Sequence, residues 1–138
     1  MLFFAPNKLN RVQGFIARLL NNNCSELKAL AEGPRLDCRV NLTMPVLVIP
    51  VDGGRPVVDG TFPALSKDFS TAGISIVVDR TRPLNDLIVA IRWEGEMYYL
   101  RGQVCHQRPM GAGFHHLGID LHEMVRPHDV PALRAVSY

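Results

Sequence analysis

Residues 40–55 read VNLTMPVLVIPVDGGR, and β character is clearest in this part of the chain. Apolar side chains alternate with Asn41 and Thr43 along residues 40–48, which is the two-residue period of a half-buried strand. Gly53 and Gly54 then supply the positive φ angles that a two-residue hairpin turn requires. The stretch therefore predicts a strand, a tight turn and a second strand that returns beside the first.

Strand-like runs continue on the C-terminal side of this hairpin. They cover Pro56–Asp68, Gly73–Val78, Asp86–Trp93, Met97–His106 and Gly113–Leu121. Residues that favour turns separate them, at Arg82-Pro83, Glu94-Gly95 and Arg108–Gly111. Six short strands at this spacing predict a mainly β fold, either a small antiparallel barrel or a sandwich. Asp129 is expected to cap a short C-terminal helix that runs through Arg134.

The first 32 residues follow a helical period instead. Apolar side chains recur at Leu9, Val12, Ile16, Leu19 and Leu20. Residues 1–25 also contain Lys8, Arg11 and Arg18 and no acidic residue. We interpret this segment as a helix that packs its apolar face on its own domain or on a second copy of the chain. The alternative is a basic amphipathic helix that lies on a membrane or on a partner.

Composition and charge narrow the class of protein. The 138 residues suffice for one domain, and 15 basic against 13 acidic residues give a net charge of +2, too low for a non-specific binder of nucleic acid polymers. The longest nearly apolar run, Met44–Val51, is far shorter than the roughly 20 residues of a membrane-spanning helix. Three cysteines without CxxC spacing favour reduced thiols. We therefore predict a cytoplasmic protein with no transmembrane segment.

Patterns typical of catalysis and metal binding are weak. Ser70 lies in no GxSxG turn of the kind that presents a nucleophile, so neither a catalytic residue nor an enzymatic activity is predicted. His116, Asp120 and His122 would share one face of a strand, but residues 116 and 122 would lie about 20 Å apart, too far to share one metal ion. We interpret these three as a solvent-facing strand surface and His106, His115 and His128 as surface residues. Neither a metal nor a cofactor is expected.

Two short motifs carry most of the functional information. Arg35 and Arg39 form an RxxxR motif, and residues 68–73 read DFSTAG, a DxSxxG motif. With 12 arginines in the chain, roughly one RxxxR pair is expected by chance, whereas DxSxxG, with Asp or Asn in first place, is expected about 0.04 times. If Gly53-Gly54 forms the turn, Arg39 lies opposite Asp68 on the neighbouring strand. The two motifs are then expected to converge at one end of the sheet.

The residue types of these motifs suit an anionic guanine nucleotide. Two guanidinium groups can make bidentate hydrogen bonds to phosphate oxygens or to the O6/N7 edge of guanine. A carboxylate and a hydroxyl can accept from base N–H groups, and Gly73 would permit a positive φ and a close backbone approach. The alternative is purely structural: an Arg–Asp ion pair closes one end of the barrel, and Ser70 caps a turn.

Together, RxxxR and DxSxxG resemble the signature of the PilZ domain, a family of six-stranded β-barrels that bind the bacterial second messenger cyclic di-GMP. The resemblance covers about residues 34–125 and includes the segments Gly73–Ile76, Gln103–His106 and Leu117–Leu121. It implies a six-stranded antiparallel PilZ-like β-barrel over residues 34–138, with residues 1–33 as a helical extension and switch segment.

The resemblance also implies a role for each motif residue. Arg35 and Arg39 would grip phosphates and guanine edges of cyclic di-GMP. Asp68 and Ser70 would contact a guanine base, and Gly73 would shape the turn.

The implied function is that of a cyclic di-GMP receptor in bacterial signalling. Ligand-driven ordering of residues 30–39 would change how the N-terminal helix is presented, and the output would pass through a protein partner or through self-association by that helix. Many relatives carry a basic residue where this chain has Pro34, and that residue is associated with a ligand dimer, so one ligand per protomer is favoured here. The alternative function is a ligand-independent interaction or scaffold module. A small enzyme acting on nucleotides is the third hypothesis.

Overall fold

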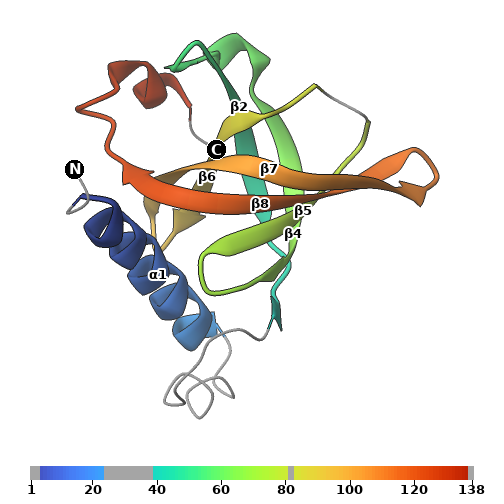
Figure 1. The fold of residues 1–138 in the computed structure, drawn as a ribbon, viewed down its shortest axis with the longest axis horizontal. Coiled ribbons are helices and arrows are strands. Elements are labelled where there is room, and N and C mark those ends of the chain that lie inside the picture. Colours follow the sequence, from blue (N-terminus) through green and yellow to red (C-terminus); the bar gives the residue numbers. More distant parts are fainter. Residues whose placement is uncertain (1–3, 24–38, 81–82, 137–138) are drawn as a thin grey trace.

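The computed structural model of the chain describes residues 4–23, 39–80 and 83–136. One helix, α1 (Phe4–Asn23), lies beside a group of antiparallel strands (Figure 1). The long strands in the described ranges are β2 (Pro45–Asp52), β4 (Phe62–Phe69), β5 (Gly73–Val78), β6 (Asp86–Trp93), β7 (Glu96–Gly111) and β8 (Phe114–Val125). The shorter elements are the strands β1 (Val40–Asn41) and β3 (Arg55–Pro56) and the 3-10 helices η1 (Val58–Gly60) and η2 (Pro131–Ala135).

The long strands close into a barrel. Their order is β4-β5-β8-β7-β6-β2, every neighbouring pair is antiparallel, and β2 pairs back onto β4. Closure removes the two open edges that a flat sheet would expose. The strand pattern left a barrel and a sandwich open, and the structure confirms the six-stranded antiparallel barrel that the resemblance implied.

The glycine turn forms as predicted, but its register does not persist beyond the turn. Gly53 and Gly54 have φ angles of 60° and 80°, and Val51 pairs with Pro56 across the turn. Pro56 has no N–H to continue the ladder, and the chain leaves the sheet there to form η1. The single strand predicted over residues 56–68 is therefore interrupted, and β2 meets β4 with Val48 opposite Phe62.

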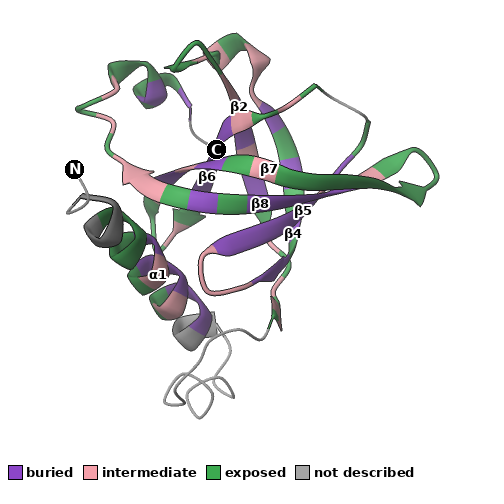
Figure 2. Cartoon of the chain, viewed as in Figure 1, coloured by how far each residue is buried: buried purple, intermediate pink, exposed green. Residues whose placement is uncertain are grey.

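The last hairpin is longer than predicted. Its turn lies at Ala112-Gly113, where φ is 55° and 84°, and not at Arg108–Gly111. Beyond Gln103, β7 pairs with β8 alone, and an edge strand tolerates a proline such as Pro109. The hairpin extends well away from the barrel, and the far part of β7 is exposed along its length (Figure 2).

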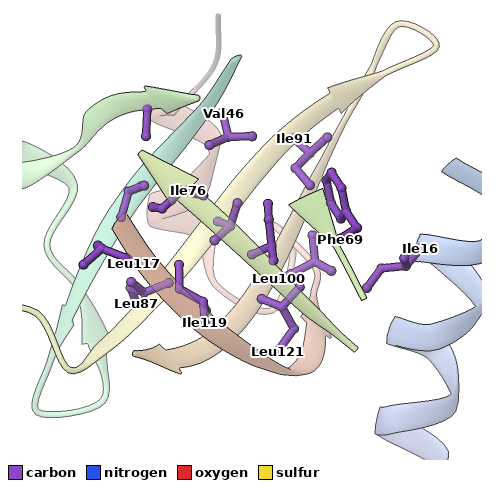
Figure 3. Close-up of a cluster of buried hydrophobic side chains, with 14 of the residues drawn as sticks. Ile16, Val46, Phe69, Ile76, Leu87, Ile91, Leu100, Leu117, Ile119 and Leu121 are labelled. Carbon is purple, nitrogen blue, oxygen red and sulfur yellow. The ribbon is translucent and has the colours of Figure 1, made fainter. Parts of the chain in front are cut away.

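α1 packs against the barrel and shares its core. Val12, Phe15, Ile16 and Leu19 are at most 2% exposed and form one cluster with barrel residues such as Phe69. Apolar side chains from all the long strands fill the rest of this cluster, and Figure 3 labels ten of its members. The helical period of the sequence is thus confirmed, and the apolar face of α1 packs on its own chain. Among the helices of the described ranges, none is both long enough and apolar enough to cross a membrane.

A second apolar cluster anchors the C-terminal residues. Leu133 and Val136 are buried, and the Tyr99 hydroxyl lies 2.8 Å from the Val136 carbonyl oxygen and 3.2 Å from that of Leu133. Burial raises the pKa of Tyr99, so its hydroxyl remains a neutral donor to these carbonyls. The predicted short C-terminal helix is a 3-10 turn that begins at Pro131, with no side-chain cap from Asp129.

Replacement by alanine is expected to have opposite effects on stability at two glycines, Gly102 and Gly14. A Cβ atom on Gly102 of β7 would overlap the backbone oxygen of Asp120 on β8, whereas a Cβ atom on Gly14 of α1 would meet nothing within 4 Å. We expect Gly102→Ala to lower the free energy of unfolding by about 3 kcal/mol, because the two strands must move apart. Gly14→Ala should raise it by about 0.5–1 kcal/mol through helix propensity. Urea unfolding measures both, and equal stability of the two variants would contradict this packing.

Candidate functional site

A bulge in β4 turns Asp68 to the outer surface of the barrel. Ser66 pairs with Ile76 on β5 and Asp68 pairs with Ser75, so Lys67 is an extra residue on β4. Phe69 follows the bulge and lies in the core, which places Asp68 on the opposite, outer face. A regular strand would have sent Asp68 to the same side as the core residue Ala64.

Asp68 belongs to a row of residues that crosses four strands. It pairs with Ser75 on β5, Ser75 pairs with Gly118 on β8, and Gly118 pairs with His106 on β7. A second bulge, at Cys105, separates the partly buried Val104 from His106. The His106 ring lies directly over Gly118, where a Cβ atom would overlap it. We call these four residues, with Arg39 added, the cross-strand row.

Arg39 reaches this row from the start of β1. Its Nη1 donates to Asp68 Oδ1 at 2.8 Å and to Ser75 Oγ at 3.2 Å. The Arg39 side chain is 57% exposed, whereas the Asp68 side chain is 10% exposed. Both bonds use one of the guanidinium nitrogens, so the group keeps further N–H donors for another partner. The arrangement is an exposed cation held in place by a buried carboxylate.

Arg39 and Asp68 meet, but not through the predicted pairing. Asn41, and not Arg39, lies opposite Asp68, because η1 shifts the register between β2 and β4. Ser66 bridges the break between β1 and β2, since its Oγ donates to the Leu42 carbonyl at 2.6 Å and accepts from the Met44 N–H at 2.9 Å. The expected direct pairing is therefore wrong, and the length of the arginine side chain closes the remaining gap.

Ser70 and Gly73 form the tight end of the β4–β5 hairpin. The Ser70 N–H donates to the Gly73 carbonyl at 3.1 Å. Gly73 does not have the positive φ that was expected. A Cβ atom there would lie 2.9 Å from Ser70 Oγ and 3.1 Å from the Ile119 carbonyl oxygen. Close approach, and not left-handed backbone, is thus the physical reason for a glycine at this position.

The other half of the RxxxR motif falls outside the described residues. Arg35, together with Gly33 and Pro34 of the expected switch segment, lies within residues 24–38. Of the five site residues predicted from the sequence, the structure thus brings Arg39 and Asp68 into contact and places Ser70 and Gly73 in the adjoining turn.

Two histidines meet at this place, His106 within the row and His116 beside it on β8, and both were predicted to be surface residues. His116 is 4% exposed, so its assignment to a solvent-facing surface is wrong, whereas His106 is exposed as expected. His106 Nε2 lies 3.3 Å from His116 Nδ1, and the rings are nearly parallel at 20°. One nitrogen must donate and the other accept, so the contact requires at least one of the two nitrogens to be unprotonated. No spacing rule could have found this pair, because the bulge at Cys105 sets the face on which His106 lies.

The surroundings of His116 favour its neutral form. Burial is the largest cause that lowers its pKa below the ordinary value of 6.5, and the positive charges of Arg108 and Lys67 and the neighbouring His106 act in the same direction. Asp68 has the opposite, smaller effect on the pKa. The pair therefore belongs to the electrostatic surroundings of the Arg39–Asp68 contact.

Because the pKa of His116 is lowered, we expect the folded protein to lose stability at acidic pH. In the folded protein its pKa is depressed, so below about 6.5 the unfolded chain binds a proton that the folded protein resists. Above that pH both states are neutral at this site and His116 contributes no pH dependence. We expect the free energy of unfolding of the wild type to fall from neutral pH to about pH 5 more steeply than that of His116→Gln. Urea titrations at several pH values test this, and His122→Gln, on the exposed part of β8, should keep the wild-type slope.

The cross-strand row has the properties of a binding surface for an anion with hydrogen-bonding edges. Arg39 offers N–H donors, and Asp68 and Ser75 fix its guanidinium. Among the described residues, no group of three or more His, Cys, Asp or Glu side chains is placed to hold a metal ion. The exposed N–H donors of Arg39 and the oxygens of Asp68 and Ser75 support recognition of charge and of hydrogen-bonding groups.

Comparison with known proteins gives a distant likeness. No protein-family model matches the chain, and no curated protein matches it. Among solved structures, the PilZ domain of CeSA from a cellulose-synthesizing bacterium is similar, with a TM-score of 0.41 and 18% sequence identity. The match covers 60% of this chain and 80% of that one. A likeness this distant assigns neither a family nor a ligand to the chain, so the ligand must be judged from the residues of the site itself.

Proposed function

We propose that this protein is a receptor for cyclic di-GMP and acts by binding, without catalysis. The observation that carries the proposal is the Arg39 guanidinium, which is exposed to solvent yet anchored at 2.8 Å on the carboxylate of Asp68. Arg39 would bind a phosphate or a guanine edge, and Asp68 and Ser70 would accept from the base. Arg35 would act as the second arginine, and Gly73 would keep the turn tight.

Anchoring Arg39 in advance favours ligand binding. A free arginine loses side-chain entropy when a ligand fixes it, whereas Arg39 is already oriented by Asp68 and Ser75. Asp68 Oδ1 accepts from Arg39, and the carboxylate has a second oxygen that can accept from guanine N–H groups.

The proposed output starts from the chain that links α1 to the site. Ordering of residues 30–39 over the ligand would change the presentation of α1, and a protein partner or a second copy of the chain would sense that change. We propose one ligand per protomer, a cytoplasmic location and a role in bacterial signalling. The differential affinity of the ligand for the ordered segment limits the population shift that this mechanism can produce.

Isothermal titration calorimetry tests the proposal directly. We expect cyclic di-GMP to bind the wild-type protein with a dissociation constant near or below about 10 μM, which corresponds to about −7 kcal/mol, at one ligand per protomer. GTP, which carries guanine and phosphates without the cyclic dinucleotide geometry, should give no comparable heat. The absence of heat and of a thermal shift at high cyclic di-GMP concentration would reject the receptor function.

One observation favours a second candidate, a ligand-independent interaction module. The Arg39 Nη1 contacts are already satisfied inside the protein, and the contact joins the start of β1 to β4 and β5. An ion pair that only stabilises the fold would make the same contacts. In that case Arg39→Ala would lower the free energy of unfolding by about 1–3 kcal/mol, because the buried Asp68 carboxylate loses its partner, and cyclic di-GMP would bind neither the wild type nor the variant.

A further inference from the structure

A groove runs between α1 and the ends of β7 and β8, away from the cross-strand row. Its volume is about 620 Å³, and its lining includes Phe15 from the helix, Tyr98 from β7 and Met124 from β8. Of the described residues that line it, only Phe15 and Tyr99 are buried, so the described part of the chain leaves the groove open. Small-molecule sites enclose most of their ligand, and a groove this open suits an extended chain better.

Three arginines flank this groove, two on α1 and one directly after β8. Arg11 and Arg18 lie two helical turns apart on α1, and Arg126 directly follows β8. All three are exposed, and within the described residues none of them forms an ion pair. No described carboxylate lines the groove. Within the described residues, the groove therefore has a positively charged rim, without a paired carboxylate, around an apolar floor.

Aromatic rings form one end of the floor. The rings of Phe15 and Tyr98 lie 4.8 Å apart, and Trp93 contacts both at 5.8 and 6.0 Å. Gly14 leaves a gap in the helix wall beside them, because a Cβ atom there would meet nothing within 4 Å. Such a gap leaves room for an apolar side chain of another molecule against the helix.

We propose that this groove docks an acidic peptide segment of a partner protein. An apolar side chain of the segment fills the space beside Gly14, and its carboxylates pair with Arg11, Arg18 and Arg126. Arg11 and Arg18 are about 10 Å apart along the helix axis, which an extended peptide spans with about three residues. Charge complementarity to the rim and apolar contact with the floor together define this partner chemistry.

The only tryptophan of the chain reports on the groove, because the Trp93 ring contacts two rings that line it, that of Phe15 edge-to-face and that of Tyr98 at a tilt. The probe is a capped nine-residue peptide without tryptophan that alternates glutamate with leucine and phenylalanine. We expect it to change Trp93 emission saturably, with a dissociation constant below about 100 μM, or about −5.5 kcal/mol. The same peptide with lysine in place of glutamate should leave the emission unchanged. No nucleotide is present, so the result is independent of cyclic di-GMP binding.

Two variants and one control locate the binding. The double variant Arg11→Glu, Arg18→Glu should weaken binding about 100-fold, since each lost charge-assisted contact is worth about tenfold. Gly14→Leu fills the gap with a good helix former, and we expect at least tenfold weaker binding with no loss of thermal stability. Arg55→Glu reverses one charge at the start of β3, outside the groove, and should bind like the wild type.

Two outcomes would overturn the proposal. If the acidic peptide binds the wild type and both groove variants equally, its binding site lies elsewhere on the surface. Absence of peptide binding, with arginine-dependent binding to phosphatidylserine vesicles, would assign the groove to a lipid surface instead.

Discussion

Replacing Arg39 with alanine is expected to weaken cyclic di-GMP binding by roughly 10–100-fold, because one or two charge-assisted hydrogen bonds to the ligand are lost. The fold should survive this change. The Arg39 side chain is 57% exposed, but the Asp68 carboxylate that loses its partner is only 10% exposed, so we expect the free energy of unfolding to fall by about 1–3 kcal/mol. Calorimetry measures the affinity, and urea unfolding of the same samples measures the stability.

Two further variants test whether the loss of binding is specific to the guanidinium group at position 39. Arg39→Lys keeps the charge but loses the planar fork, so we expect an affinity between those of the wild type and Arg39→Ala. Arg134→Ala removes an exposed arginine on η2 and should bind like the wild type. If Arg39→Ala binds cyclic di-GMP as tightly as the wild type, the cross-strand row is not the binding site, whatever the ligand does elsewhere.

Most strands and the N-terminal helix could be predicted from the sequence because strand period, helical period and turn chemistry are local, whereas closure into a barrel followed only from the resemblance. Gly53-Gly54 adopts the expected φ angles, and alternation along residues 40–48 corresponds to parts of β1 and β2. Residues 12–20 likewise carry the helical period that α1 buries, whereas Leu9, the first residue of the pattern, is exposed. Each of these signals depends on a residue and its near neighbours, and the structure preserves them.

The details of the site could not be predicted, because two single-residue bulges set them. The bulge at Lys67 turns Asp68 outward, and the one at Cys105 separates the core-facing Val104 from His106. A bulge shifts every later residue to the other face, yet it has no reliable sequence signature. Arg39 and Asp68 were nevertheless correctly expected to lie close together, since an arginine side chain spans the two-residue error in register.

Replacing Phe15 with alanine is expected to lower the free energy of unfolding by about 3–5 kcal/mol. Phe15 is 1% exposed, and its ring contacts those of Trp93 and Tyr98 on the barrel. Leu9→Ala on the same helix should cost less than about 1 kcal/mol, since Leu9 is 37% exposed and loses far less buried contact than Phe15. Chemical unfolding followed by Trp93 emission and by circular dichroism should show one transition for both variants.

Comparing Phe15→Ala with Leu9→Ala tests whether α1 folds as part of the barrel core or as an extension that can separate from it. A single transition with a large Phe15 effect means that the helix folds as part of the barrel core, so a signal from the site cannot release it without loss of several kcal/mol. Cyclic di-GMP would then act on the chain between α1 and Arg39, while the groove flanked by Arg11, Arg18 and Arg126 keeps its shape. A small Phe15 effect, or an early separate loss of helix, would contradict the packing of α1 and favour release of the whole helix as the output.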